Sequence, residues 1–344
     1  MLKPIMTDDE CARLRTLVRT AQTIVIVCHQ HPDGDAIGSM LGLWNVLGTS
    51  GKEALMAIPD QYPDNLHWMP HTEKIVRYDK HGDYIDAVLK IADLICCIDF
   101  NDLQRTDQMA AAIAASPARR IIIDHHPAVG TPADLSVICP KASSACEVLF
   151  RVVWQLGLFD RLDKHFAGPV YCGMMTDTGS FTYNSADPDL YFIISQLLTK
   201  RINKDQIYRN VYHNFSENRL RLVGHVLCNR LVVDAPRHAA YFTLTRQDLH
   251  RFHFIKGDAE GLVNMPLQIK GLKLSISLRE DTERERLVWV SLRSVDNVPC
   301  NEMAARFFNG GGHFNASGGR LECSIQEAVD VVRQCFAAYE DTLK

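Results

Sequence analysis

The segment "RRIIIDHHPAVG" (residues 119–130) decides which kind of fold this chain adopts. Three consecutive isoleucines run directly into Asp124, His125 and His126. An unbroken apolar, β-branched run of this length predicts a parallel strand that is buried on both faces. An acid and two imidazoles at the end of such a strand indicate chemistry if the same pattern recurs elsewhere in the chain.

The pattern recurs twice. The apolar run "TIVIVC" (23–28) leads into "HQHPDGDAIGS", and the run "LICCI" (94–98) leads into "DFND". Helical patterns lie between the runs, at 35–48, where Asp35 is a candidate N-cap, and at 106–118. Alternating strands and helices predict an α/β fold with a doubly wound parallel sheet.

Polar residues at the ends of parallel strands are expected to meet at one edge of the sheet. These residues are His29, His31, Asp33 and Asp35 after the first run, Asp99, Asn101 and Asp102 after the second, and the Asp124–His126 triplet after the third. A further acid, Asp177, follows the apolar part of "GPVYCGMMTDTGSF". For one cluster alone, a helix cap or a surface histidine is an equally good explanation. Three clusters favour a site, although we assign His31, Asn101 and Asp102 to structural roles.

Composition excludes several functional classes. The chain has 344 residues, 47% of them hydrophobic and 23% charged, which predicts two soluble domains. No apolar run approaches the roughly 20 residues that span a bilayer, and we expect no membrane association. The eleven cysteines form no C-x-x-C pair and indicate reduced thiols in a cytoplasmic protein. The net charge of −4 argues against binding long duplex nucleic acid.

The sequence pattern changes near residue 232. The segments 231–245, 272–280 and 286–294 predict antiparallel strands, and 324–343 predicts a closing helix. We therefore predict two domains: residues 1–232, an α/β domain with helices at 143–157 and 188–232, and residues 233–344, a smaller α+β domain.

The acidic clusters are suited to divalent cations. So many carboxylates in one crevice would repel one another unless protons or cations neutralise them. Oxygen-rich donors with a few imidazoles favour Mn²⁺ or Mg²⁺ over a thiolate zinc site. Asp33 and Asp35 could each serve a different ion and Asp99 could bridge the two, an arrangement that typically directs water onto phosphorus.

A second motif lies in "FFNGGGHFNASGGR" (307–320). Gly310, Gly311 and Gly312 allow close approach of the backbone to a ligand, and successive N–H groups can hold an anion. His313 could donate a hydrogen bond to a phosphate. The alternative explanation is a flexible glycine loop without a ligand.

Taken together, "HQHPDGDAIGS", "CIDF", "IIIDHH", "MMTDTGSF" and "GGGHFNASGG" resemble the DHH phosphoesterase superfamily in its DHH–DHHA1 branch. Within this branch the motifs are similar to those of the nanoRNase/pAp phosphatases. The resemblance covers nearly the whole chain in motif order, and it implies an active site in the cleft between the two domains. The family often has Asn where this chain has His31, which agrees with a non-ligand role for His31.

The resemblance also implies a role for each site residue. His29, Asp33 and Asp99 would hold one Mn²⁺, and Asp35, Asp99, His125 and Asp177 would hold a second, with Mg²⁺ or Co²⁺ as alternatives. A hydroxide between the ions would be the nucleophile. Asp124 would orient the histidines. His126 would face the substrate phosphate, stabilising its charge or protonating the leaving oxygen.

The second domain would then bind the substrate. The expected substrate-binding residues are Arg293, Ser294, Gly310, Gly311, Gly312 and His313, with Arg279 as a weaker candidate. The implied substrates are short RNA oligonucleotides and adenosine 3′,5′-bisphosphate (pAp). The alternatives are a linear dinucleotide (pApA) hydrolase in cyclic-di-AMP turnover, a polyphosphatase, a RecJ-like exonuclease and a nucleotide-binding regulator. The assembly state stays open, with a homodimer as one option.

Overall fold

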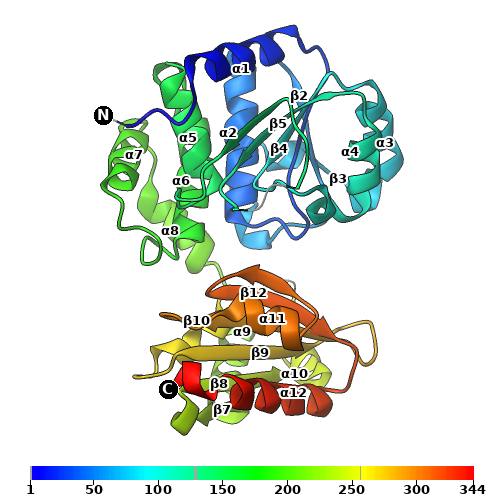
Figure 1. Cartoon of the computed structure of the whole chain (residues 1–344), viewed down its shortest axis with the longest axis vertical. Coiled ribbons are helices and arrows are strands. Elements are labelled where there is room, and N and C mark those ends of the chain that lie inside the picture. Colours follow the sequence, from blue (N-terminus) through cyan, green and yellow to red (C-terminus); the bar gives the residue numbers. More distant parts are fainter. Residues whose placement is uncertain (1, 128–129, 256) are drawn as a thin grey trace. The chain divides into compact units, whose positions relative to one another are not determined.

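The computed structural model describes residues 2–127, 130–255 and 257–344. The chain divides into two compact units, Met1–Asn214 and Phe215–Lys344, and each is described by itself. The first unit is built on a six-stranded parallel sheet with the order β3-β2-β1-β4-β5-β6 (Figure 1). Its strands are β1 (Ile24–Val27), β2 (Ala54–Ile58), β3 (Ile75–Arg77), β4 (Leu94–Ile98), β5 (Arg119–Asp124) and β6 (Leu135–Ile138). The predicted doubly wound parallel sheet is confirmed.

The three strands expected from apolar runs are direct neighbours at the centre of this sheet. β1 pairs in parallel with β4, and β4 pairs in parallel with β5. Alternate residues of β1 enter opposite cores: Ile24 and Ile26 pack on one face, and Val25 and Val27 on the other. Both faces are apolar because helices cover both, which explains why the sequence shows continuous apolar runs instead of alternation.

Helices form the outer layers of the first unit. One face of the sheet is covered mainly by α1 (Asp8–Thr20), α2 (Gly34–Thr49), α5 (Ala145–Gln155), α6 (Lys164–Asp177) and α7 (Pro188–Thr199), with α8 (Lys204–Tyr212) beside them. The other face is covered by α3 (Tyr78–Ile91) and α4 (Ala110–Ala115). The helix expected at 106–118 is shorter, because its first part belongs to a 3₁₀ segment, η3 (Leu103–Met109), which is kinked at Asp107 (φ 48°), and only Ala110–Ala115 is α-helical.

Close packing of α2 against α6 brings two site elements together. A Cβ on Gly38 of α2 would lie 2.5 Å from the carbonyl oxygen of Pro169 in α6, so only glycine permits this approach. One turn earlier, a Cβ on Gly34 would lie 2.4 Å from Thr176 Oγ1. The beginning of α2 therefore lies against the end of α6. The N-cap of α2 is Asp33, not Asp35 as expected, because the helix begins at Gly34.

The second unit contains a six-stranded sheet with the order β11-β12-β10-β9-β8-β7. Its strands are β7 (Leu231–Asp234), β8 (Ala239–Leu244), β9 (Leu274–Glu280), β10 (Val288–Ser294), β11 (Gly311–His313) and β12 (Ala316–Leu321). The strand pairs are antiparallel, as expected, except that β8 runs parallel to β9. The intervening segment, which includes α10 (Arg246–Arg251) and the 3₁₀ helix η7 (Leu262–Gln268), makes this crossover possible.

The two faces of this second sheet are covered differently. One face packs against α11 (Cys300–Phe307) and α12 (Ile325–Ala338), which is followed by the short α13 (Glu340–Leu343). The other face is covered over β8 by α9 (Glu217–His225), the π-helical turn Val226–Arg230, α10 and η7. Leu222 and Val226 pack with Phe242 and Leu244, so the helical stretch that the sequence analysis counted with the first domain lies in the second unit.

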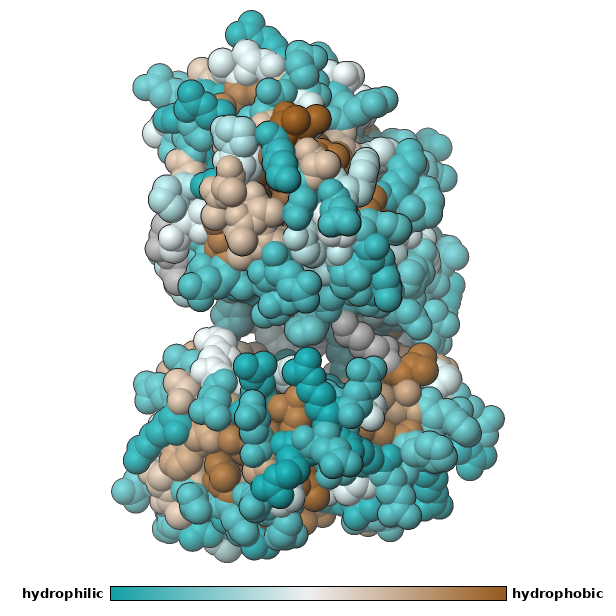
Figure 2. Space-filling model, turned by 90° about the vertical axis from the view of Figure 1, so that its right-hand side faces the viewer, coloured by the Kyte–Doolittle hydropathy of each residue, from teal (hydrophilic) through white to brown (hydrophobic). Residues whose placement is uncertain are grey.

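On the face shown in Figure 2, hydrophilic residues cover most of both units, and hydrophobic residues are exposed only in small groups. Among the described residues, no helix has both the length and the apolar composition needed to cross a bilayer.

Candidate metal centre

The first sheet reverses its strand order between β1 and β4, and the residues that follow these two strands face each other. Binding sites in open α/β sheets form outside the carboxyl ends of the strands at such a reversal. His29 comes two residues after β1, and Asp99 comes directly after β4. His29 Nε2 lies 3.2 Å from Asp99 Oδ2. The polar residues that follow β1 and those that follow β4 therefore lie at the same edge of the sheet, as expected.

The first donor group contains His29, Asp33 and Asp99. One donor atom of each lies within 4.8 Å of the others. His29 Nδ1 is 2.8 Å from the carbonyl oxygen of Gln30, which fixes the proton on Nδ1 and leaves the Nε2 lone pair directed at the group. Asp33 Oδ1 accepts hydrogen bonds from two backbone N–H groups at the start of α2 and thereby holds its carboxylate in place.

The second donor group contains Asp35, His125 and Asp177. His125 Nε2 lies 4.0 Å from Asp35 Oδ2 and 3.7 Å from Asp177 Oδ2. Asp35 is held by the backbone N–H groups of Ala145 and Cys146 at the beginning of α5, at 2.6 and 2.9 Å. Asp177 is the last residue of α6 and reaches the group through the close α2–α6 packing.

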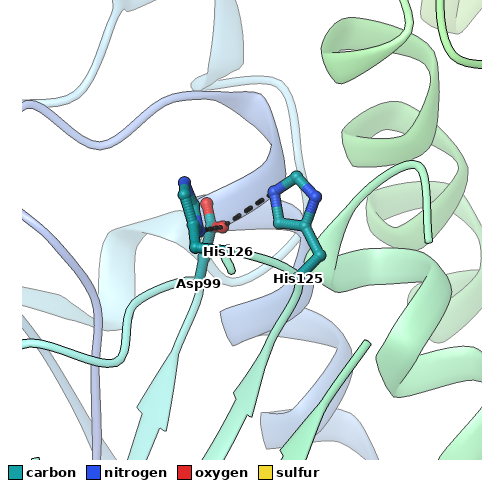
Figure 3. A group of neighbouring side chains, drawn as sticks. All are labelled: Asp99, His125 and His126. Atoms are coloured by element: carbon teal, nitrogen blue, oxygen red, sulfur yellow. Dashed lines mark ion pairs between the residues drawn. The ribbon is translucent and has the colours of Figure 1, made fainter. Parts of the chain in front are cut away.

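Asp99 connects the two groups. Its Oδ2 faces His29, and its Oδ1 lies 3.5 Å from His125 Nε2 (Figure 3). Oδ1 is buried and has no hydrogen-bond partner among the described residues. Its backbone has φ 62°, a left-handed conformation that is uncommon outside glycine and turns the side chain toward the site. One carboxylate with an oxygen toward each group is the geometry of a bridging ligand.

The electrostatics of the site call for positive charge. Burial, followed by the nearby charges of Asp35 and Asp33, raises the pKa of Asp99 well above its usual range. Burial and then Asp33 raise the pKa of Asp35 to about 6. Asp177 is itself exposed at the surface, and its pKa is raised by desolvation at the site and then by the charges of Asp35, Asp33 and Asp99. Burial and the neighbouring His126 lower the pKa of His125 to about 4, so its imidazole is neutral at pH 7.

This donor set fits two divalent cations. It offers carboxylates that resist ionisation unless a cation is near, two imidazoles, and a buried carboxylate oxygen that has no hydrogen-bond partner among the described residues. Among the described residues the groups contain no thiolate donor, which favours hard, oxygen-preferring ions over a structural zinc.

His126 forms a third possible donor group with Asp99 and His125 (Figure 3), but its ring nitrogens also have other partners. Its Nδ1 is 2.7 Å from Asp124 Oδ1 and its Nε2 is 3.0 Å from Arg105 Nη1. A guanidinium can only donate, so Nε2 accepts and Nδ1 carries the proton to Asp124. Although His126 Nδ1 also lies within 3.6 Å of Asp99 Oδ1, both of its ring nitrogens are engaged elsewhere. Hydrogen bonds and charge from His126 outweigh burial and lower the pKa of Asp124.

Arg105 was not expected from the sequence. Besides His126, its guanidinium lies 3.4 Å from the backbone oxygen of Asp99. The only signal was an arginine shortly after the "CIDF" motif, directly before the segment 106–118 that was expected to be a helix. The residues assigned to structural roles lie outside the donor groups: His31 pairs with Asp60, Asp102 caps η3, and Asn101 donates to the backbone oxygen of His126.

The expected substrate-binding residues belong to the second unit. Arg293 points from β10 to the face opposite α11 and α12, and His313 is exposed at the end of β11. Ser294 points the other way, since neighbouring strand residues alternate. Its buried hydroxyl donates to the carbonyl of Val298.

The glycines of the "GGGH" motif have a packing role. A Cβ at Gly310 would lie 1.9 Å from the carbonyl oxygen of Gly318, and one at Gly312, whose φ is 141°, would lie 2.7 Å from the carbonyl oxygen of Ala316. Both glycines therefore allow β11 to lie against β12. Only Gly311 is open, with nothing within 4 Å of a Cβ.

Comparisons with protein-family models divide the chain in the same order. Residues 23–174 match the model described as "DHH family, N-terminal domain", and residues 240–338 match the model described as "DHHA1 domain".

Individual proteins are similar over most of the chain. The bifunctional oligoribonuclease and PAP phosphatase NrnA of Thermus thermophilus is 26% identical over 300 residues, 87% of this chain and 84% of that protein. The crystal structure of an exopolyphosphatase-related protein from Bacteroides fragilis has a TM-score of 0.96 and 45% identity, and covers 99% of both chains. RecJ of T. thermophilus in complex with Mn²⁺ has a TM-score of 0.57 at 13% identity, covering 97% of this chain and 54% of that one, a likeness of fold alone.

Proposed function

Since the chain belongs to the DHH phosphoesterase family, with a DHHA1 domain, and is a hydrolase of phosphoester bonds, we propose that it cleaves short oligonucleotides and removes the 3′-phosphate of pAp. The bifunctional name of the T. thermophilus relative supports both activities. The substrate part of the proposal rests on the site, and a direct assay tests it.

The observation that carries the proposal is the position of Asp99 between two donor groups. His29, Asp33 and Asp99 would hold one divalent cation, and Asp35, Asp99, His125 and Asp177 would hold the other. When bound, such a pair lowers the pKa of water and neutralises charge on the scissile phosphate. We propose Mn²⁺ as the ion, since carboxylates mixed with imidazoles suit it, with Mg²⁺ or Co²⁺ as substitutes.

His126 would act on the leaving oxygen. Asp124, whose pKa is held low, stays ionised at pH 7 and stabilises a positive charge on the His126 ring. His126 Nε2 accepts from Arg105, so it can take a proton only when that hydrogen bond is released. A substrate phosphate would draw the Arg105 guanidinium to itself, because bidentate arginine–phosphate contacts are strong. His126 could then donate a proton from Nε2.

The second unit would bind the rest of the substrate through Arg293, His313 and the open backbone at Gly311. Arg293 lies half-buried in a sheet face, where a guanidinium binds phosphate more strongly than at a fully hydrated surface. A net charge of −4 gives the chain no general attraction for long nucleic acid. Short substrates that occupy a few local sites are therefore favoured over long strands.

A substrate panel tests the proposal. Purified protein with Mn²⁺ would be given pAp, linear pApA, a dinucleotide, a pentanucleotide and a 20-nucleotide strand, with products separated by ion-exchange chromatography. We expect the best kcat/KM on pAp and the short oligonucleotides, and complete loss after chelation. Asp99→Asn, whose side chain keeps its shape but cannot bridge, should be inactive. Equal kcat/KM on the 20-nucleotide strand would refute the preference for short substrates.

A second candidate comes from the name of the B. fragilis relative. That protein is called exopolyphosphatase-related and is 45% identical to this chain, so polyphosphate belongs in the same panel. Phosphate release from a polyphosphate chain at a kcat/KM above that for pAp would favour this second function. The "GGGH" segment, which the family resemblance links to nucleotide substrates, argues against it.

A further inference from the structure

The second sheet has a hollow that includes Arg279, the weaker candidate for substrate binding, together with residues that have no role assigned so far. It encloses about 350 Å³ on the face that carries Arg293, and its main lining residues are Arg279, Trp289, Ser291, Asn309, Gly318 and Arg320. α9, α10 and η7 cover this face over β8 and the neighbouring part of β9, and the hollow begins where that cover ends. It lies wholly within the second unit.

The strand register arranges an indole between two guanidinium groups. Trp289 of β10 pairs directly with Arg279 of β9 on one side and with Arg320 of β12 on the other. Residues directly opposite in antiparallel strands project to the same face, and adjacent strands lie about 4.8 Å apart. The three side chains therefore form one row across the sheet (β9, β10 and β12 in Figure 1).

The indole is fixed in orientation. Trp289 Nε1 donates to Asp281 Oδ2 at 2.7 Å. The other carboxylate oxygen of Asp281 accepts from the backbone N–H groups of Glu283 and Arg284. A ring held in this way loses little conformational entropy when a ligand stacks on it.

The two cations are available to an anion. Among the described residues, neither Arg279 nor Arg320 has a carboxylate within salt-bridge distance, and the guanidinium of Arg279 lies 5.5 Å from the ring of Phe254. Asp281, the acid that interacts with Arg279 at longer range, already accepts three hydrogen bonds. Two such cations beside an aromatic ring fit a nucleotide unit, which has a base to stack and a phosphate on each side.

Small residues connect this row to the row of Arg293 and His313. Ser291, Gly318 and Gly311 lie opposite one another between the two rows, so no large side chain separates them. Trp289 and Arg293 are four residues apart on one strand, which places the rows about 13 Å from each other. A ligand as small as a mononucleotide bisphosphate bound at Arg293 would not fill both rows.

We propose that Arg279, Trp289 and Arg320 form a separate subsite for an additional nucleotide of a short oligonucleotide, with the base on the indole and phosphates on the two guanidinium groups. The proposal rests on the proposed function and extends it. This subsite makes the enzyme bind oligonucleotides more tightly than pAp, which occupies the Arg293 row alone. It is independent of sequence, because every base has a face to stack.

The test compares Trp289→Ala with Trp289→Phe. Removing one base-stacking contact should raise KM for a pentanucleotide on the order of 10-fold, leaving kcat and all constants for pAp unchanged. Trp289→Phe keeps an aromatic face and should stay within a few-fold of wild type. Arg320 is exposed, and Arg320→Ala should raise the KM for the pentanucleotide while leaving kcat and KM for pAp unchanged. Equal losses on pAp and the pentanucleotide, or no loss on either, would overturn the subsite.

A binding measurement separates this inference from the proposed function. Anisotropy of a fluorescein-labelled pentanucleotide in chelator reports affinity without hydrolysis. Weaker binding by Trp289→Ala than by wild type supports the subsite, whether or not the wild type hydrolyses the substrates. A wild type that binds the pentanucleotide but hydrolyses neither substrate would refute only the proposed function. Identical affinities of wild type, Trp289→Ala and Arg320→Ala would refute the subsite even in an active enzyme.

Discussion

Replacing Asp99 with asparagine should affect the stability of the protein in opposite directions with and without metal. In metal-free protein, Asp99 is a buried acid surrounded by other acids, and its raised pKa reports the cost of ionising it there. Asparagine has the same shape and no charge, so the metal-free variant should melt at the same temperature as wild type or above it. With metal present the variant lacks the bridging carboxylate and should melt well below wild type.

The size of the metal effect follows from mass action. A cation that binds only the folded state at 100 times its Kd stabilises that state by about 2.7 kcal/mol. The first unit, Met1–Asn214, is of the size for which 1 kcal/mol shifts Tm by about 2–4 °C. Saturating Mn²⁺ should therefore raise the wild-type Tm by about 5–10 °C per ion. In Asp99→Asn both groups lose a donor, so a rise of under about 2 °C is expected.

Differential scanning calorimetry after exhaustive chelation, with and without added Mn²⁺, measures the Tm difference between Asp99→Asn and wild type in both states. Asp60→Asn is the matched control, because Asp60 pairs with His31 outside the donor groups and should keep the wild-type response. Turnover of pAp should fall in Asp99→Asn by more than the roughly 10–100-fold typical of losing an outer-shell partner. A Mn²⁺-dependent rise in Asp99→Asn equal to that of wild type would refute the bridging role.

Three further predictions concern other parts of the molecule. His125→Ala should lose metal by elemental analysis, whereas His126→Ala should keep it and lose about 10²–10⁴-fold in kcat; exchanged phenotypes would contradict the assignment. Asp35 has a pKa raised to about 6, so the Tm increase caused by Mn²⁺ should be full at pH 7.5 and fade as pH falls through 6. In metal-free protein the stability that Asp35 contributes is full below the pKa of its unfolded form, about 3.9, and is lost as pH rises through 6. Calorimetry over this pH range, with and without Mn²⁺, shows whether these two changes of Tm with pH have opposite directions. Gly312→Val should destabilise the second unit by forcing β11 from β12, while Gly311→Ala should leave its melting unchanged, and thermal melts of both decide whether the motif is needed for packing.

The central strands and the donor clusters were predictable because local sequence determines them. A short β-branched run such as "RRIII" favours a strand buried on both faces, and the order of a parallel sheet then brings the residues after β1, β4 and β5 to one edge. The edge strands β3 and β6 are short and only partly apolar, with the sequences IVR and LSVI, so they gave no comparable signal.

Other features depend on contacts that no local pattern encodes. The contact of Arg105 with His126 joins residues from two different loops of the sheet edge, and the burial of the Ser294 hydroxyl depends on which face of β10 meets α11. The parallel pairing of β8 with β9 likewise requires knowing that the segment between them crosses over the sheet. For the same reason, the row of Arg279, Trp289 and Arg320 becomes visible only once the register of three strands is known.

The dispersed origin of the metal donors has a kinetic consequence. They come from separate stretches between residues 29 and 177, so neither donor group exists until β1, β4, β5 and α6 have assembled. Contacts between residues so distant in the chain form late in folding. An ion that binds only after this assembly stabilises the native state more than the transition state, and it therefore slows unfolding without speeding folding. With the proposed ions bound, the folded chain should therefore survive proteolysis longer than the metal-free chain does.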